Sequence, residues 1–407
     1  MIYYSYMDAL LNSVWHYVGI LWPYGLAILI VHTFIQKWME YVRTDFNIKQ
    51  GSTLLEIKIP REIMKSPLAM ELVFTALHLP IDGNWVSSYL KGNVRPWFSC
   101  EIISDEGNIR FFIWTQTKFK DTVEAQLYAQ YPTVEVYEVP DYVSRFKFDP
   151  EKQDLYGACF KLTAPDVYPI KTYVDYGMDK DPKEEFKIDP LTSTLETMST
   201  LKKGEQMWIQ IIIQAHMSKG LKAGHLFKTK NWQDEAKEEI EKIREESTPK
   251  TEDDYPGFPN PTKGEMEKIA AIERSIGKFP FDCAIRGMYF ADKEIYNKGR
   301  PGVLGGVFRQ YSSNYLNGFK RGWHINFDYP WQDFMGIRLT GFKRAFFEAY
   351  RTRGYFHGPF KNFAEKPFIL MTEELATIFH FPGSVSQAPG LSRIPSKKSD
   401  APSNLPI

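Results

Sequence analysis

The stretch Met207-Trp-Ile-Gln-Ile-Ile-Ile213 is the most apolar part of the chain after the first 50 residues. It is rich in β-branched residues, which favour extended backbone, and it lacks the alternation of a strand with one face in water. The pattern therefore predicts a central β-strand that is buried on both faces. Such a strand needs neighbouring strands and covering helices, and the flanking sequence carries signals for both.

Residues 51–142 carry the signals of a βαββαβ unit. Ser66 is the predicted N-cap of its first helix, with Pro67 at the first helical position and an apolar stripe formed by Leu68, Ala69, Leu72, Val73, Ala76 and Leu77. The order is that of the ferredoxin-like split β-α-β arrangement. The strands are expected at 55–59, 97–103, 109–114 and 133–139, and the helices at 67–77 and 120–129.

Residues 143–381 repeat this order with an insertion. Strands are expected at 155–162, 207–213 and 283–291, with helices at 190–201, which Asp189 caps, and at 303–310. Residues 217–280 are predicted to form a helical arm with helices near 233–246 and 263–276. A strand at 368–371 leads into a short helix at 372–379, and the Pro- and Ser-rich tail at 382–407 is expected to remain a linker. The predicted class is α+β, with two ferredoxin-like units and a helical insertion in the second.

Residues 1–50 contain a run of 28 uncharged residues between Asp8 and Lys37. A hydrocarbon core of about 30 Å needs roughly 20 helical residues, so the run predicts one transmembrane helix, with room for a kink at its proline. Trp15, Trp38 and Tyr41 lie where aromatic rings settle at the two membrane interfaces. A cleaved signal peptide and a buried soluble helix are the alternatives.

The distribution of basic residues predicts the orientation of this helix. Lys37, Arg43 and Lys49 follow the uncharged run and none precedes it, which predicts an N-terminus outside and the bulk of the chain in the cytoplasm. Cys100, Cys159 and Cys283 have no disulfide-framework or metal-knuckle spacing, which fits a reducing compartment.

The composition excludes whole-chain disorder and a strong global charge. Hydrophobic residues make up 43% of the 407 residues, and 50 Lys and Arg balance 50 Asp and Glu. The sequence contains no P-loop, H-E-x-x-H or G-x-S-x-G motif and no His/Cys cluster at ligand spacing. No catalytic, cofactor-binding or metal-binding residue is therefore predicted, and we do not expect an enzyme.

Charge segregation is the one positive signal for a binding surface. Residues 298–361 hold eleven Lys or Arg and three Asp or Glu, whereas residues 232–268 hold six and twelve. Aromatic residues such as Trp323, Trp331, Tyr350 and Tyr355 are interleaved with the cations, a mixture that can hold phosphates and stack single-stranded bases. The alternative is that the aromatics are core and the cations face a protein partner. The candidate contact residues are Arg309, Lys320, Arg321, Arg338, Lys343, Arg344, Arg351 and Arg353.

Several phrases resemble the region that precedes the ATPase domain in bacterial type IV secretion and conjugation ATPases of the HerA/FtsK-like superfamily. They lie at Leu55–Glu62, Ser66–Leu72, Ala129–Tyr142, Gly204–Ile212 and Thr372–Pro382, and in the tail from Ser396. The chain departs from the family pattern because it stops where the ATPase domain would begin. The likeness therefore carries over no active-site residue.

The resemblance implies a place in a translocation machine. It leads us to expect a single-pass protein of the cytoplasmic membrane that serves as a scaffold and docks a separate P-loop translocation ATPase. Membrane lipid is then an expected partner, and a homo-oligomer is compatible with this arrangement. The alternative function is a membrane-tethered protein that binds single-stranded nucleic acid, with DNA as its partner, through residues 298–361.

Overall fold

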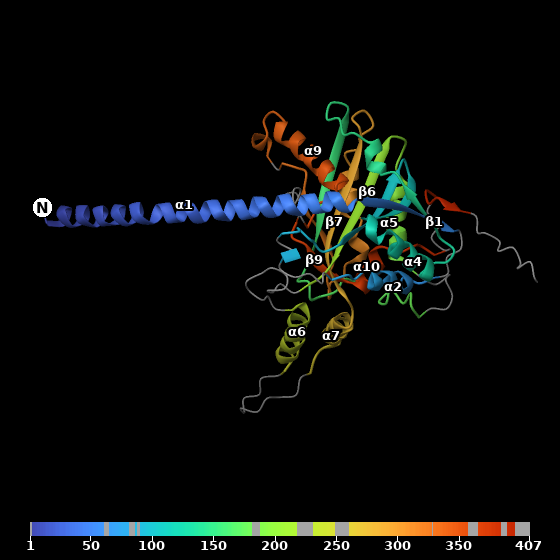
Figure 1. Cartoon of the computed structure of the whole chain (residues 1–407). Helices are drawn as coiled ribbons and strands as arrows, with labels where there is room; N and C mark the ends of the chain where they lie inside the picture. Colours follow the sequence, from blue (N-terminus) through green and yellow to red (C-terminus); the bar gives the residue numbers. More distant parts are fainter. Residues whose placement is uncertain are drawn as a thin grey trace, which may run out of the picture.

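A computed structural model describes residues 2–60, 65–80, 86–87, 90–180, 188–217, 231–248, 260–327, 329–356, 365–383 and 389–394. One long helix projects from a folded body that is built on a single large sheet (Figure 1). The helix is α1 (Ile2–Gln50), and it passes through Pro23 without a break. At a rise of 1.5 Å per residue, its 49 residues extend about 73 Å.

The first half of the sheet comes from residues 52–139. Its strands are β1 (Ser52–Pro60), β2 (Trp97–Asp105), β3 (Asn108–Gln116) and β4 (Glu135–Val139), in the spatial order β4-β1-β3-β2 with antiparallel neighbours. Glu106 and Gly107 both take positive φ in the β2–β3 turn, as a tight right-twisted hairpin requires. The two crossing helices are α2 (Leu68–Ala76) and α4 (Lys120–Gln130).

The second half repeats this order. Its strands are β5 (Gln153–Leu162), β6 (Glu205–Ala215), β7 (Pro280–Asp292) and β8 (Phe319–His324), and they lie in the order β8-β5-β7-β6 with antiparallel neighbours. The helices of this half are α5 (Pro190–Ser199) and the short α8 (Arg300–Gly305). The predicted α+β class is confirmed, and each half has the strand order of a βαββαβ repeat.

The two halves join through an antiparallel pairing of β2 with β6, which runs from Trp97–Gln214 to Asp105–Gln206. All eleven residues of β6 are buried, which confirms the central strand predicted at 207–213. Residues 51–142 and 143–381 therefore share one continuous sheet.

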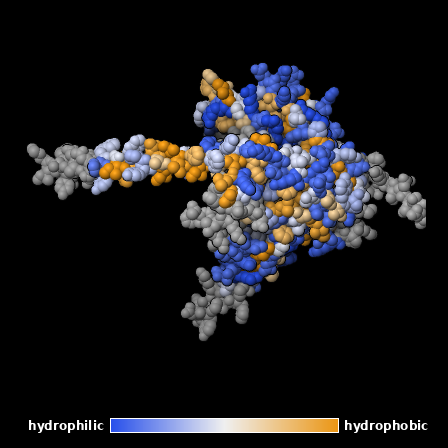
Figure 2. All heavy atoms as spheres, in the orientation of Figure 1, coloured by the Kyte–Doolittle hydropathy of each residue, from blue (hydrophilic) through white to orange (hydrophobic). Residues whose placement is uncertain are grey.

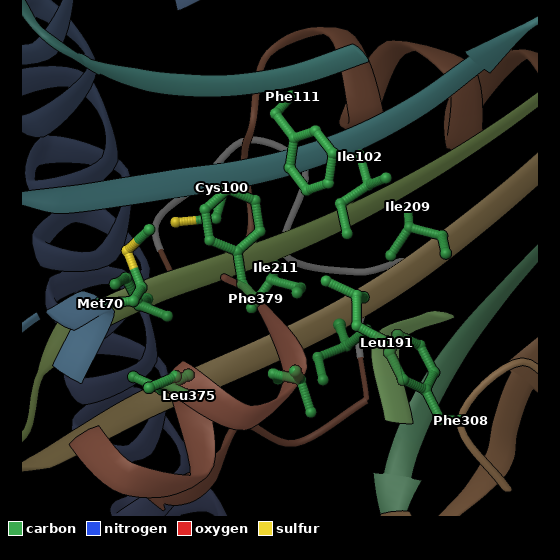
Figure 3. Packing of buried hydrophobic residues seen from close by; sticks show 14 of the residues in the cluster. Met70, Cys100, Ile102, Phe111, Leu191, Ile209, Ile211, Phe308, Leu375 and Phe379 are labelled. Atoms are coloured by element: carbon green, nitrogen blue, oxygen red, sulfur yellow. The ribbon is translucent and has the colours of Figure 1, made fainter. Parts of the chain in front are cut away.

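The two faces of the sheet carry separate cores. One face packs against α2, α4, α5 and α10 (Thr372–Ile378), and Figure 3 shows side chains of β2, β3 and β6 gathered there with those of the helices. The other face packs against α9 (Ile337–Arg351) and the turn at Tyr142–Arg145. Alternate residues of each strand point to opposite faces, so Ile209 and Ile211 join the first core while Trp208 and Ile212 join the second.

The inserted arm consists of α6 (Trp232–Glu246) and α7 (Lys263–Ile276), close to the predicted bounds. Thr262 and Glu265 form a capping box that fixes the start of α7. The arm has a small core of its own, in which Ile240 and Ile272 are buried, and it contacts the body through Met371 at the end of β9 (Phe368–Met371).

Several local predictions are wrong. Pro67, not Ser66, is the N-cap of α2, and Leu68 and Leu72 face solvent because Met70 and Phe74 supply the buried stripe. The helix expected at 303–310 is α8 followed by a 3-10 turn. The strand β8 and the helix α9 were not predicted, because the charged residues of 320–344 masked their apolar positions.

The predicted linker at 382–407 is partly ordered. Within it, β10 (Arg393–Ile394) pairs in parallel with the end of β1, and Leu391 bridges Ile109. Residues 384–388 and 395–407 of this prediction lie outside the described residues.

Candidate functional site

The projecting part of α1 has the length and surface of a membrane helix. Its side chains from Trp15 to Ile35 are exposed, and Figure 2 shows apolar residues along the helix before it reaches the body. Trp15 and Trp38 are 23 positions apart, which is about 35 Å of helix and slightly more than a hydrocarbon core. This rod is long and apolar enough to cross a bilayer, with an aromatic ring near each interface.

The last turns of α1 are packed on the body. Met39 and Val42 are buried, and Phe46 packs against the core of the α9 side with the Nζ of Lys118 5.7 Å from its ring centre. Gly92 has a positive φ of 68°, and a Cβ there would lie 2.4 Å from the carbonyl oxygen of Val42. Only glycine allows this close approach, so Gly92 lets the segment after α2 pack directly against the backbone of α1 at Val42.

A pocket of about 360 Å³ lies where α1 meets the body. The side-chain amide atoms of Gln116 are buried without a hydrogen-bond partner among the described residues, as is Oδ1 of Asn47. The lining is mainly apolar and aromatic, which suits a small uncharged group. It is formed by Thr44, Asn47, Ile48, Gly51, Ser52, Trp97, Trp114, Gln116 and residues 352–356.

A buried polar network crosses the sheet beside this pocket. Glu101, Gln210 and Arg286 lie opposite one another on β2, β6 and β7. Gln210 donates to Glu101 at 2.9 Å and accepts from Nε of Arg286 at 2.7 Å. Arg353, in the left-handed region at φ 50°, donates to both carboxylate oxygens of Glu101, at 3.0 and 3.1 Å.

Asp141, Ser99 and Tyr142 complete the network. Arg353 also pairs with Asp141, while the hydroxyls of Ser99 and Tyr142 donate to Glu101 at 2.7 and 2.8 Å. Burial by itself raises the pKa of Glu101, but the attraction of Arg353 and its hydrogen bonds hold this pKa below the usual value. Both ions are buried, so the pair joins the segment after α9 to the sheet.

A second charged cluster lies on the opposite side, between α2, α7 and α10. Lys278 contacts Glu71 at 2.5 Å, and Arg274 contacts Glu373 at 2.9 Å. Glu374 accepts the backbone N–H groups of Met371 and Ile170, and burial raises its pKa to about 8. These contacts tie the arm to the body. The described residues contain no group of three or more His, Cys, Asp or Glu side chains placed to hold a metal ion.

The structure distributes the eight predicted basic residues over different surroundings. Arg353 is buried in the network, and Lys343 is paired with Asp154. The exposed ones are Arg309 between α8 and β8, Lys320 and Arg321 on the edge strand β8, and Arg338, Arg344 and Arg351 on α9. Arg351 contacts Glu348 at 2.5 Å. The described cations between residues 298 and 356 therefore do not form one continuous face, because α8 and α9 cover opposite sides of the sheet.

The interleaved aromatic residues divide in the same way. Tyr350 and Tyr355 are core residues, and Trp323 stacks on Phe346 at 5.8 Å. Trp331 is exposed and stacks on Tyr329 at 4.5 Å. The latter pair presents open aromatic faces beside the cations of α9.

Sequence reasoning missed the Glu101 network. A signal was present, since Glu101 and Arg286 each lie in the middle of a strongly apolar strand, with the nearest other charge of that strand four positions away, a pattern that indicates buried partners. Nothing local connects either of them to Arg353, which lies 252 positions from Glu101.

Comparison with known protein families gives one match. A family described as "Domain of unknown function (DUF8128)" matches residues 44–390, from the base of α1 to the start of the last described segment. A search of curated proteins found no match.

Proposed function

We propose that this chain, which belongs to the DUF8128 domain family, is a membrane-anchored scaffold that holds its α+β body at the cytoplasmic face and docks a separate translocation ATPase. One observation carries this proposal: the apolar helix α1 enters the body without a linker. Only Gly51 separates Gln50 at the end of α1 from Ser52 at the start of β1.

This connection favours a scaffold over a protein that is merely tethered. A flexible linker lets a domain sample many orientations, whereas a helix whose last turns pack on the domain fixes the domain relative to the bilayer. Gly51 takes a positive φ of 65°, and a Cβ there would lie 2.9 Å from the hydroxyl of Thr117 on the body. A docking platform needs such a fixed orientation, because its partner must meet one surface at one height above the membrane.

The expected orientation follows from the basic residues after the apolar run. The three cysteines are all buried, so a new surface cysteine would be the one reactive thiol of the folded chain. Glu196→Cys, on the exposed face of α5, provides this probe. We expect a membrane-impermeant maleimide to label it only after cell lysis, and the wild-type chain not at all. Labelling of intact cells would contradict the orientation.

Anchoring and partnership are separate measurements. We expect the full chain to stay with the membrane pellet after alkaline carbonate extraction. Affinity purification from detergent-solubilised membranes should then recover a P-loop ATPase. An anchored, folded protein that repeatedly recovers no ATPase would leave the anchor in place and refute the docking role.

The alternative, binding of single-stranded nucleic acid, is favoured by one observation, the open Tyr329–Trp331 pair next to Arg338 on α9. A gel-shift titration of the full chain in nanodiscs tests it. Salt-sensitive binding that is lost on reversing the charges of Arg338 and Arg344 would support this function. The matched control is Arg309→Glu on the opposite side of the sheet, and no binding at low salt would reject the alternative.

A further inference from the structure

The loop before α9 displays a dense group of exposed apolar side chains. Phe334 is 92% exposed, Met335 81% and Trp331 71%, and these are the three most exposed large apolar residues described outside α1. Tyr329 and Ile337 are also exposed. Exposed apolar neighbours occur elsewhere too, such as Leu68 and Leu72 on α2, but each of these is less than half exposed. An apolar group of this density on an otherwise polar surface indicates contact with an apolar phase or a partner.

This loop is ordered by its own polar contacts. Asp333 accepts the backbone N–H groups of Arg338 and Leu339, at 3.2 and 2.7 Å, and so caps the start of α9. Gly336 takes a positive φ of 69° to allow the turn, and Nη1 of Arg338 donates to the carbonyl of Gln332 at 2.9 Å. The polar groups are satisfied within the loop while its apolar side chains are left outside.

The fold brings this loop to the side of the body from which α1 projects. The segment that follows α9, residues 352–356, lines the same pocket as Thr44 and Ile48 of α1, so the C-terminal end of α9 lies beside the base of α1. From there α9 leads back on the side of the projecting rod, as Figure 1 shows. Figure 2, in the same orientation, shows apolar residues over that outer part of α9.

The helical rise fits the level of the membrane interface. From Thr44 back to Trp38 is about 9 Å along α1, whereas α9 is about 21 Å long from Arg351 to Ile337. A projection of about 9 Å on the axis of α1, less than half of the length of α9, is enough to bring the loop level with Trp38. That residue is the ring expected at the inner interface.

We propose that residues 329–337 form a second membrane contact, in which their apolar side chains enter the interfacial layer of the same bilayer that α1 crosses. The inference rests on the proposed anchor. Trp and Tyr favour this layer, and Arg338 and Arg344, both exposed on α9, suit anionic headgroups beside it. Two contacts, one through the bilayer and one on its surface, fix the tilt and rotation of the body.

The test measures the depth of three single-cysteine probes in the full chain. Ile28→Cys in α1, Phe334→Cys in the loop and Lys58→Cys on β1 are each labelled with an environment-sensitive fluorophore. Lys58 is exposed on the strand that leads away from the end of α1, so it reports the far side of the body. The labelled chains are placed in nanodiscs of phosphatidylcholine and phosphatidylglycerol, with or without doxyl-labelled lipid.

We expect doxyl lipid to quench the labels at positions 28 and 334 and to leave the label at 58 unchanged. The emission of the label at 334 should also shift to shorter wavelength when the protein is moved from detergent, where a lipid-free micelle covers only α1, into the nanodisc. Quenching at 28 without quenching at 334 overturns the loop contact and leaves the anchor intact, and it points to a protein partner for the loop. A label at 28 that is not quenched overturns the anchor and the loop contact with it.

Discussion

Replacement of Arg353 by Met tests how the second face of the sheet is held together. Arg353 makes two hydrogen bonds to Glu101, which is fully buried, and pairs also with Asp141. Methionine keeps most of the side-chain volume but leaves the carboxylate of Glu101 without a cation. Removal of one partner of a buried ion pair costs about 3–5 kcal/mol of the free energy of unfolding.

The double variant Glu101→Gln/Arg353→Met isolates the charge from the packing. It removes both charges of this pair. The side-chain oxygen of the glutamine can still accept from Ser99, and its NH2 group can donate to the hydroxyl oxygen of Tyr142. We therefore expect the double variant to be more stable than Arg353→Met alone. The measurement is urea unfolding of the detergent-solubilised chain, followed by tryptophan fluorescence, to which Trp208 in the same core contributes. At a slope of about 3 kcal/mol per molar urea, the single variant should lose roughly 1–1.7 M in its midpoint.

The two proteins should also respond to pH in opposite directions. In the wild type the pKa of Glu101 is lower in the folded than in the unfolded chain. The ionised carboxylate therefore adds to the free energy of unfolding above the unfolded pKa, and this stabilisation is lost as pH falls through the folded pKa. In Arg353→Met, burial without the cation raises that pKa, so the variant should gain stability as pH falls towards the unfolded value. A loss below about 1 kcal/mol, or the same pH response in both proteins, would refute the role of the pair.

Three further changes test other contacts. Gly92→Ala places a Cβ against the carbonyl oxygen of Val42, so we expect the base of α1 to loosen and trypsin to cleave there faster. Gly157→Ala places a Cβ 2.4 Å from the ring of Phe346, and this overpacking should cost about 1–3 kcal/mol in urea unfolding. Burial raises the pKa of Glu374 to about 8, so its protonated carboxyl adds to the free energy of unfolding below the unfolded pKa, and this stabilisation is lost as pH rises through about 8. Glu374→Gln should remove that part of the pH dependence of stability.

Each of these changes has a contradicting result. Gly341→Ala, on the exposed side of α9 with open space around it, is the glycine control and should not destabilise the body. Equal trypsin cleavage in Gly92→Ala and wild type would mean that α1 does not dock as described. A stability difference between wild type and Glu374→Gln that is constant from pH 5 to pH 9, a range of roughly four units, would show that Glu374 does not titrate in it.

If the anchor and the loop contact both hold, the body is a platform with a defined face towards the cytoplasm. The arm of α6 and α7 is part of that platform, because Arg274 and Lys278 link it to Glu373 and Glu71. Its acidic surface, with Asp234 and Glu235 in the first turn of α6, is then available to a basic partner.

The sequence by itself determined the features that depend on local periodicity. The uncharged run predicted α1, the β-branched segment at 207–213 predicted the central strand, and the cap residue Asp189 predicted the start of α5. These signals are strong because the cause of each structure lies within a few residues. They predicted the α+β class and the order of elements through residue 291, with α5 and both arm helices.

The tertiary structure alone decided what brings distant residues together. The pairing of β2 with β6 merges two units into one sheet, and it sets Glu101 beside Gln210, so that Arg353 is drawn into the core. From sequence alone, a charged residue such as Glu101 is expected at the surface unless its partner is known. Here the partner, Arg353, lies far along the chain. The free energy of such contacts depends on burial, which no short window of sequence contains.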